Sequence, residues 1–238
     1  MKSIIRKLLR ILHLDITLNL KYDRLTEKIF AQTLNKNSVA IDVGAHKGEV
    51  LDLMLKYAPN GKHFAIEALP HLAQALKDKY KNTVVFQNAL SDKKGKVHFN
   101  FVKNAPAYSG LKQREYAIAN PDIEQIEVEM TLLDDLIPEK TPITLIKIDV
   151  EGAEYQVLLG ATRILKESKP LVIFEFGLGA SDRYGTSPQM ILDFFNRFDY
   201  GIYSLNSYLS NDKKLELNEL IALYETKKEC YFVAKPQL

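Results

Sequence analysis

A short apolar segment that ends in a glycine loop constrains the fold more than any other feature of the chain. Residues 38–48 read Ser-Val-Ala-Ile-Asp-Val-Gly-Ala-His-Lys-Gly, which predicts a buried strand over 39–43 and a helix over about 47–57. A buried strand that enters a helix through a glycine turn is the first unit of a nucleotide-binding α/β sheet. We expect Gly44 and Gly48 to let the backbone come close to a ligand, where a side chain would collide.

Asp42 stands two residues before the first glycine and indicates what kind of ligand the loop binds. A carboxylate there would repel a pyrophosphate, but it suits the α-amino group and sulfonium of S-adenosylmethionine (SAM). The loop also lacks the G-x-G-x-x-G spacing of a dinucleotide site. These observations favour a SAM site, to which Ala45 and His46 would also contribute. The alternative is that the glycines only close a tight turn and that Asp42 hydrogen-bonds within it.

Length and composition fit one α/β domain of a reducing compartment. A chain of 238 residues can bury a full hydrophobic core. Its 32 basic and 30 acidic residues leave a net charge of +2, which argues against a dedicated nucleic-acid binder. The single cysteine, Cys230, excludes an intrachain disulfide and predicts a cytoplasmic location. The sequence has no run of about 18 apolar residues, so it predicts no membrane span.

The N-terminal region reads as helical. Residues 2–14 combine isoleucine and leucine at helical spacing with lysine and arginine on the other positions. Such a helix either docks on the domain or on a second subunit, or lies on the inner face of an anionic membrane. A second amphipathic helix is predicted over 23–34. We therefore expect a helical cap over 1–37 and the nucleotide-binding domain over 38–238.

Two further strand ends complete a predicted nucleoside site. The acid that follows the strand 62–66 lies about one βα unit after the glycine loop, where it would accept hydrogen bonds from ribose hydroxyls. The loop that follows the strand 83–87 falls where an adenine would lie, with a leucine to pack on the ring. The alternative for this loop is a simple polar turn. The residues of this predicted site are Glu67, Ala68, Asn88, Ala89 and Leu90.

Residues 96–102 and 126–131 alternate apolar and polar side chains, which predicts a strand pair on an insertion rather than core parallel strands. The loop between them, 105–121, is polar and carries tyrosines. Loops beside a cleft often contact the substrate. Tyr108 and Ser109 are therefore predicted substrate contacts.

Carboxylates gather again after the buried strand 143–148, where the sequence reads Asp-Val-Glu-Gly-Ala-Glu before a helix predicted over 154–166. Ligands bind at the carboxyl ends of parallel strands, so we expect Asp149 to face one crevice together with Asp42. Glu175 ends the next strand, 169–176, and is a predicted substrate contact. Such acids can bind a divalent cation, but no spacing here demands one, and we predict no metal.

The remaining elements are less informative. A helix is predicted over 187–198, and the last strands over 201–205 and 230–234, with no assignment for 206–229.

Taken together, these motifs resemble the FkbM family of SAM-dependent methyltransferases. The matching segments are Val-Ala-Ile-Asp-Val-Gly-Ala-His-Lys-Gly (39–48), Ala-Ile-Glu-Ala-Leu-Pro (65–70), Asn-Ala-Leu-Ser-Asp (88–92), Thr-Leu-Leu-Asp-Asp-Leu (131–136), Ile-Lys-Ile-Asp-Val-Glu-Gly-Ala-Glu (146–154) and Val-Ile-Phe-Glu (172–175). The resemblance implies an α/β fold of the class I methyltransferase (Rossmann-like) type. This is a three-layer αβα sandwich with a seven-stranded, mostly parallel sheet whose last strand is antiparallel. At Ala68 the family often has proline.

The resemblance also implies SAM as methyl donor and O-methylation of a sugar, glycan or related natural-product hydroxyl. Asp42 and the glycine loop would hold the methionine part of the donor. Asp149, Glu151 and His46, in that order, are the candidate general bases, and Asp149 is also a candidate donor contact. The alternatives are a nicotinamide-dependent oxidoreductase and a non-catalytic SAM- or nucleoside-binding module.

Overall fold

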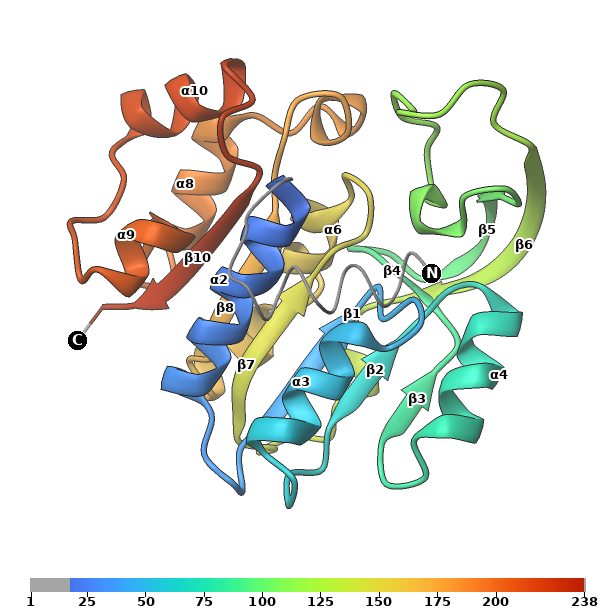
Figure 1. Ribbon diagram of the computed structural model, residues 1–238, viewed down its shortest axis with the longest axis horizontal. Coiled ribbons are helices and arrows are strands. Elements are labelled where there is room, and N and C mark those ends of the chain that lie inside the picture. Colours follow the sequence, from blue (N-terminus) through green and yellow to red (C-terminus); the bar gives the residue numbers. More distant parts are fainter. Residues whose placement is uncertain (1–17, 238) are drawn as a thin grey trace.

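A sheet of seven strands forms the middle layer of the molecule in the computed structural model, which describes residues 18–237 (Figure 1). Its strand order is β3-β2-β1-β7-β8-β10-β9. The strands are β1 (Val39–Val43), β2 (Phe64–Ile66), β3 (Val84–Phe86), β7 (Ile143–Ile148), β8 (Leu171–Glu175), β9 (Tyr200–Ser204) and β10 (Tyr231–Pro236). The neighbours from β3 to β8 pair in parallel, whereas β10 runs antiparallel to both β8 and β9.

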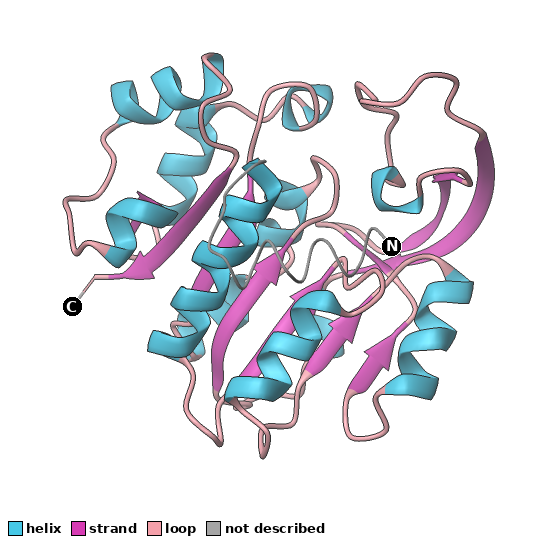
Figure 2. Ribbon diagram, viewed as in Figure 1, coloured by secondary structure: helices cyan, strands magenta, loops and turns pink. Residues whose placement is uncertain are grey.

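Helices cover both faces of this sheet (Figure 2). One face is covered by α2 (Leu18–Thr33), α3 (Glu49–Tyr57), α4 (Pro70–Lys79) and α9 (Leu205–Leu209). The other is covered by α5 (Leu133–Leu136), α6 (Glu154–Leu159), α7 (Thr162–Glu167), α8 (Pro188–Asn196) and α10 (Leu217–Glu225). Because both faces are buried, the central strands are mostly apolar, with Asp42 in β1 and Lys147 in β7 as exceptions. The predicted three-layer class I methyltransferase fold is confirmed.

The predicted insertion is a second, separate sheet beside the edge of the first (Figure 1). Its strands are β4 (Ala89–Leu90), β5 (Gly95–Val102) and β6 (Ile123–Thr131). β5 and β6 pair antiparallel, as the alternating pattern predicts, and β4 adds a short parallel pairing that the sequence does not reveal. One face of this sheet packs a small apolar cluster that includes Phe99 and Leu72, a residue of α4. The insertion is thereby fixed to the main domain.

The structure differs from the sequence-based prediction at several elements. The helix predicted over 154–166 is two helices, α6 and α7, divided at Gly160, where the chain lies against the backbone of Ser91 and a side chain would collide. The unassigned span 206–229 contains most of α9 and all of α10. α2 begins at Leu18, earlier than predicted, and its side chains belong to the core of the domain.

Some predictions lie beyond what the structure describes. The amphipathic segment 2–14 falls outside the described residues, and the division into 1–37 and 38–238 stays a prediction. Within residues 18–237, no helix has the length and apolar composition needed to span a membrane.

Candidate active site

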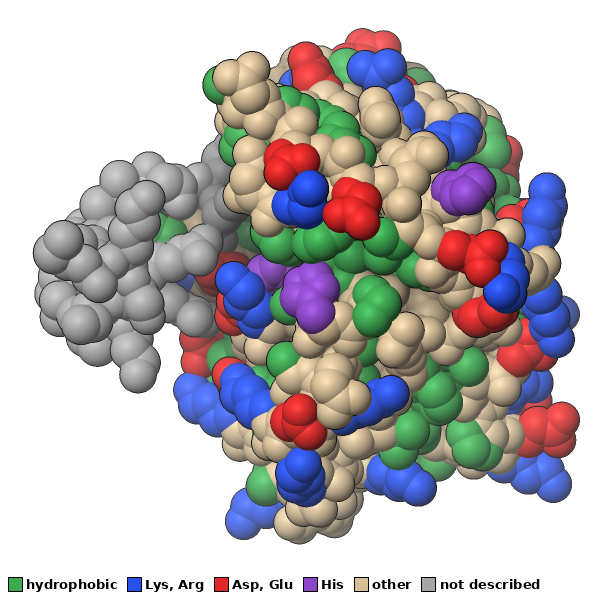
Figure 3. Space-filling model, turned by 90° about the vertical axis from the view of Figure 1, so that its right-hand side faces the viewer, with side chains coloured by type: hydrophobic (Ala, Val, Ile, Leu, Met, Phe, Trp, Pro, Cys, Tyr) green, Lys and Arg blue, Asp and Glu red, His purple; other side chains and the backbone are tan. Residues whose placement is uncertain are grey.

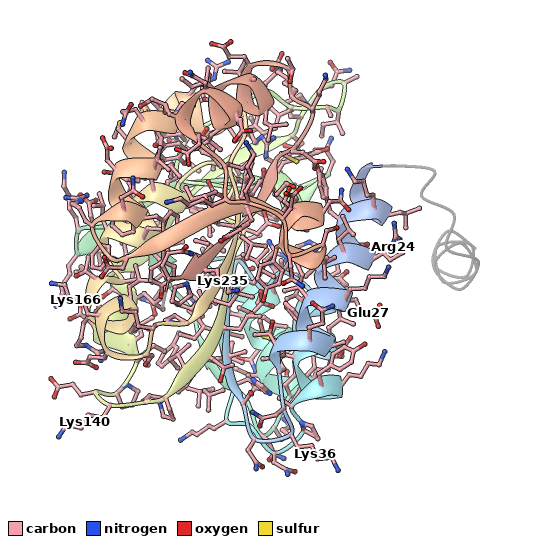
Figure 4. All side chains as sticks on the ribbon, turned by 90° about the vertical axis from the view of Figure 1, so that its left-hand side faces the viewer. Arg24, Glu27, Lys36, Lys140, Lys166 and Lys235 are labelled. Carbon is pink, nitrogen blue, oxygen red and sulfur yellow. The ribbon has the colours of Figure 1, made fainter. Side chains whose placement is uncertain are left out.

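An open cavity of about 580 Å³ lies at the carboxyl ends of β1, β2 and β7, with the insertion as its outer wall. Figure 3 faces this side of the molecule, where hydrophobic and histidine side chains gather. Lys36 and Lys140 mark the opposite end, where β1 and β7 begin (Figure 4). Eight of the predicted donor-site residues line the cavity: Gly44, His46, Glu67, Ala68, Asn88, Ala89, Leu90 and Asp149. So do Ser109 and Glu151.

The glycine loop after β1 is shaped by neighbouring protein atoms. Gly44 has a φ of +81°, and a side chain on it would collide with the carbonyl group of Asp149. Gly48 has a φ of +83°, and a side chain there would collide with the ring of Tyr80. Ala45 and Gly48 do not line the cavity. Close approach within the protein thus requires both glycines, and the predicted approach to a ligand stays a prediction for Gly44, which lines the cavity, but not for Gly48.

Glu67 connects the loops that follow β1 and β2. Its Oε2 accepts a hydrogen bond from the backbone N–H of His46, and its Oε1 accepts one from Leu69, both at 2.8 Å. Burial raises the pKa of the Glu67 carboxyl, although these N–H groups oppose the shift. A carboxylate has about four lone-pair sites, so Glu67 can still accept from a ligand hydroxyl.

His46 presents an unsatisfied nitrogen at the cavity. It has a φ of +47°, which turns the loop sharply, and its Nδ1 lies 3.8 Å from Oε2 of Glu49. Its Nε2 is buried and has no hydrogen-bond partner within the described part of the chain. A buried polar atom without a partner is costly, so this nitrogen is suited to a ligand.

Asp42 does not line the cavity, which corrects the expectation that it shares one crevice with Asp149. Side chains alternate along a strand, and Asp42 points to the face where Ala40 packs, beside its register partner Lys147. It is only 2% exposed, and its Oδ2 has no partner among the described residues. Burial raises the pKa of Asp42 to about 7, despite the charge of Lys147.

Asp149 continues the ladder of β7, since its N–H donates to the carbonyl of Val43 at 3.0 Å. Its Oδ2 accepts from the Tyr231 hydroxyl at 2.5 Å and from Nζ of Lys147 at 3.1 Å. Burial alone would raise the pKa of Asp149. The charge of Lys147 and the hydrogen bonds from Tyr231 and Glu175 lower it overall.

Three acids form a compact group at the floor of the site. Asp149, Glu151 and Glu175 each place one carboxylate oxygen within 4.8 Å of the others, close enough to hold a cation. Arg114 pairs with Glu151, and Lys147 pairs with Asp149, so positive charge already reaches the group from the protein. Burial and the charge of Asp149 raise the pKa of Glu175 well above its usual range.

The two remaining predicted substrate contacts lie beside the cavity rather than in its lining. Glu175 lies with Asp149 as described. Tyr108 packs with Tyr116, their ring centroids 6.2 Å apart, and the guanidinium of Arg114 lies 5.7 Å from its ring centroid. Tyr108 therefore contributes to the structure of the insertion loop.

Glu154, the last acid of the motif after β7, supports the loop before α6. Its Oε1 accepts hydrogen bonds from the N–H groups of Val150, at 3.0 Å, and Gly152, at 3.1 Å. Burial raises its pKa to about 7. This role agrees with the structural explanation for an acid in the first turn of a helix.

Sequence reasoning missed several residues of the site, including the following four. Phe99 lines the cavity from β5, and Lys147, Tyr231 and Arg114 contact the acids. A lysine inside the otherwise apolar strand Ile-Lys-Ile is a signal that could have drawn attention to Lys147. The other three gave no such signal, because their contacts join segments far apart in the chain.

Comparison with known proteins gives the family. The model of the Methyltransferase FkbM domain matches residues 42–202. Among curated proteins, none matches this chain. The chain is similar to the solved methyltransferase FkbM of Methylobacillus flagellatus KT, with 20% identity over 71% of this chain and 40% of that one, and a TM-score of 0.48. The chain therefore spans well under half of that relative.

Two further solved structures are similar over most of their length. A TehB-like SAM-dependent methyltransferase of Corynebacterium glutamicum shares 11% identity over 90% of this chain and 88% of that one, with a TM-score of 0.47. A Streptococcus mutans protein solved with S-adenosylhomocysteine (SAH) shares 13% identity over 90% and 96%, with a TM-score of 0.48. Since the domain match alone covers more than half of the sequence, the chain belongs to the FkbM family of SAM-dependent methyltransferases.

Proposed function

We propose that this protein transfers a methyl group from SAM to a hydroxyl oxygen of a sugar, glycan or related natural-product acceptor. The observation that carries the proposal is the pairing, in one open cavity, of an apolar wall with carboxylates that follow β2 and β7. An apolar wall suits an adenine ring, and carboxylates suit the ribose hydroxyls and the cationic methionine part of SAM. A phosphate-rich dinucleotide would meet like charge instead.

The described residues divide the donor between them. Leu90 and Phe99 would pack on the adenine, with Asn88 at its edge. Glu67 would accept from the ribose hydroxyls, and the unpartnered Nε2 of His46 offers a further polar contact. Asp149 would lie near the positive charge of the donor. Bound SAM supplies a methyl group that is already activated, so the protein contributes chiefly alignment.

We propose a different order for the candidate bases. A carboxyl with a lowered pKa is a weak proton acceptor, which makes Asp149 better suited to binding and orientation. Glu151 is paired with Arg114. His46 keeps a free ring nitrogen at the cavity, and in this proposal it takes the proton of the acceptor hydroxyl.

Titration calorimetry with SAH, with NAD as the comparison ligand, tests the donor part of the proposal. We expect binding of SAH and none of NAD, whereas the reverse would support a nicotinamide-dependent oxidoreductase. A screen of sugar, glycolipid and polyketide hydroxyl acceptors, read as SAH release, tests the reaction. Donor binding without release for any acceptor would support a non-catalytic binding module.

His46→Ala and Asp149→Asn separate the roles once an acceptor is found. We expect His46→Ala to lower kcat by about 10²-fold or more, the usual range for a general base. Asp149→Asn should mainly raise the dissociation constant of SAH. Full turnover by His46→Ala would remove this residue from proton transfer.

A further inference from the structure

The side chain of Asp149 is held by donors from two other places in the sheet. Lys147 stands two positions earlier on β7, and Tyr231 begins β10, more than 80 residues later in the chain. Both donate to the same oxygen, Oδ2, at 3.1 Å and 2.5 Å. A carboxylate that receives two donors on one oxygen has a fixed rotamer, because turning either way breaks a charge-assisted hydrogen bond.

The two donors also hold each other in place. The ammonium of Lys147 lies 4.4 Å from the centroid of the Tyr231 ring, within the range of a cation–π contact. Tyr22 of α2 also packs against Tyr231, and the two ring centroids lie 4.9 Å apart. The Lys147 side chain is only 4% exposed, so water competes little for these bonds. Such packed support keeps a site residue in one geometry.

We propose that Tyr231 and Lys147 are positioning residues that fix Asp149 through Oδ2, next to Glu175, and so set the orientation of its carboxylate toward the molecule bound in the cavity. The proposal rests on the proposed function only in naming SAM as that molecule. Asp149 is also faced by Glu175 from β8 and by Glu154 from α6, while Arg114 from the insertion loop faces Glu175. The charge of Lys147 also acts on Asp42 of β1, where it opposes the rise in pKa caused by burial.

Tyr231→Phe is the direct test, because it keeps the ring and removes only the donor. The measurement is the titration midpoint of the Asp149 carboxyl, followed by ¹³C NMR of protein labelled at the aspartate carboxyl carbons. The resonance is assigned by its loss in Asp149→Asn. A hydrogen bond to the charged form lowers a carboxyl pKa, so its removal should raise the midpoint by about one pH unit. Lys147→Met should raise the same midpoint, since a positive charge is lost.

Tyr200→Phe is the matched control. Tyr200 is also a buried tyrosine of the same sheet, but its hydroxyl donates to the carbonyl of Pro170. We expect this control to leave the Asp149 midpoint unchanged. Equal midpoints in Tyr231→Phe, Lys147→Met and wild type would overturn the proposal. The proposal would also be overturned if Tyr231→Phe and Lys147→Met lowered the melting temperature but left the Asp149 midpoint unchanged.

SAH calorimetry on the same proteins separates this proposal from the proposed function. Tyr231→Phe should weaken SAH binding about tenfold, because Asp149 is free to turn, and Tyr200→Phe should not. If wild-type protein bound no SAH while the midpoint still shifted in Tyr231→Phe, the donor assignment would fail and the positioning of Asp149 would stand.

Discussion

Replacing Asp42 by asparagine should make the protein more stable, and increasingly so as the pH rises. Asp42 is a buried carboxyl whose pKa is raised from its ordinary value of 3.8 to about 7. Between these two values the folded state binds more protons than the unfolded state, so this group makes the free energy of unfolding fall as pH rises. Below pH 3.8 both states are protonated and this effect vanishes. Above about pH 7 it is complete.

The magnitude follows from the shift. One pKa unit corresponds to about 1.36 kcal/mol, so ionisable Asp42 lowers the free energy of unfolding by about 2 kcal/mol at pH 5 and about 4 kcal/mol at pH 8. Asparagine has the same shape and does not ionise. The difference in unfolding free energy between Asp42→Asn and wild type should therefore grow by about 2–3 kcal/mol between pH 5 and pH 8. Any constant difference between an amide and a protonated carboxyl cancels in this comparison.

Urea unfolding of both proteins at pH 5, 6, 7 and 8 provides the measurement. The comparison with wild type removes the titration of other buried acids, such as Glu154. Asp78→Asn is the control, because Asp78 lies on α4 with 66% of its side chain exposed. A difference between Asp42→Asn and wild type that stays constant from pH 5 to pH 8 would refute the reasoning. It would mean that Lys147 compensates the burial of Asp42 in full.

Three further predictions concern the site. Gly44→Ala should lower the melting temperature and abolish SAH binding in calorimetry, since alanine is strained at a φ of +81° and would collide with the Asp149 carbonyl; unchanged SAH affinity would contradict this. Phe99→Ala should weaken SAH binding about tenfold, because Phe99 forms part of the apolar wall, whereas Phe101→Ala, outside the lining, should not. Arg114→Ala should lower kcat/KM for an identified acceptor by about tenfold and leave SAH affinity intact, since Arg114 pairs with Glu151 and the proposal uses neither residue to hold SAM; Arg183→Ala, at an exposed arginine, is the control. A loss of SAH affinity in Arg114→Ala would place this residue at the donor instead.

The fold was predictable because its signals are local. The strand that ends at Val43 and the strand 143–148 are short apolar runs bounded by glycine or acidic loops, and the structure has both at the predicted residues. The alternation in 96–102 likewise identified the insertion before any contact was known. The break at Gly160 was not predicted, and the close approach of Gly160 to the backbone of Ser91, which is distant in sequence, leaves no signal in the local pattern.

The sequence predicted single residues of the candidate site, but not the direction of their side chains or their contacts with distant segments. Strand ends identified Glu67 and Asp149, which do line the cavity. Which way Asp42 points depends on the register and alternation of β1, and the glycine loop alone could not reveal this. Tyr231 reaches Asp149 because the antiparallel β10 returns beside β8, a tertiary contact with no trace in either segment.

The second sheet has a consequence for how acceptor choice can change. Its first strand, β4, contributes Ala89 and Leu90 to the cavity, and the long loop between β5 and β6 contributes Ser109 and Leu111. The proposed donor contacts come from the strand ends of the central layer and from β4 and β5, whereas the loop between β5 and β6 belongs to a unit with its own small core. Under the proposed function, sequence changes in this loop would alter which acceptor is methylated and leave the donor contacts in place.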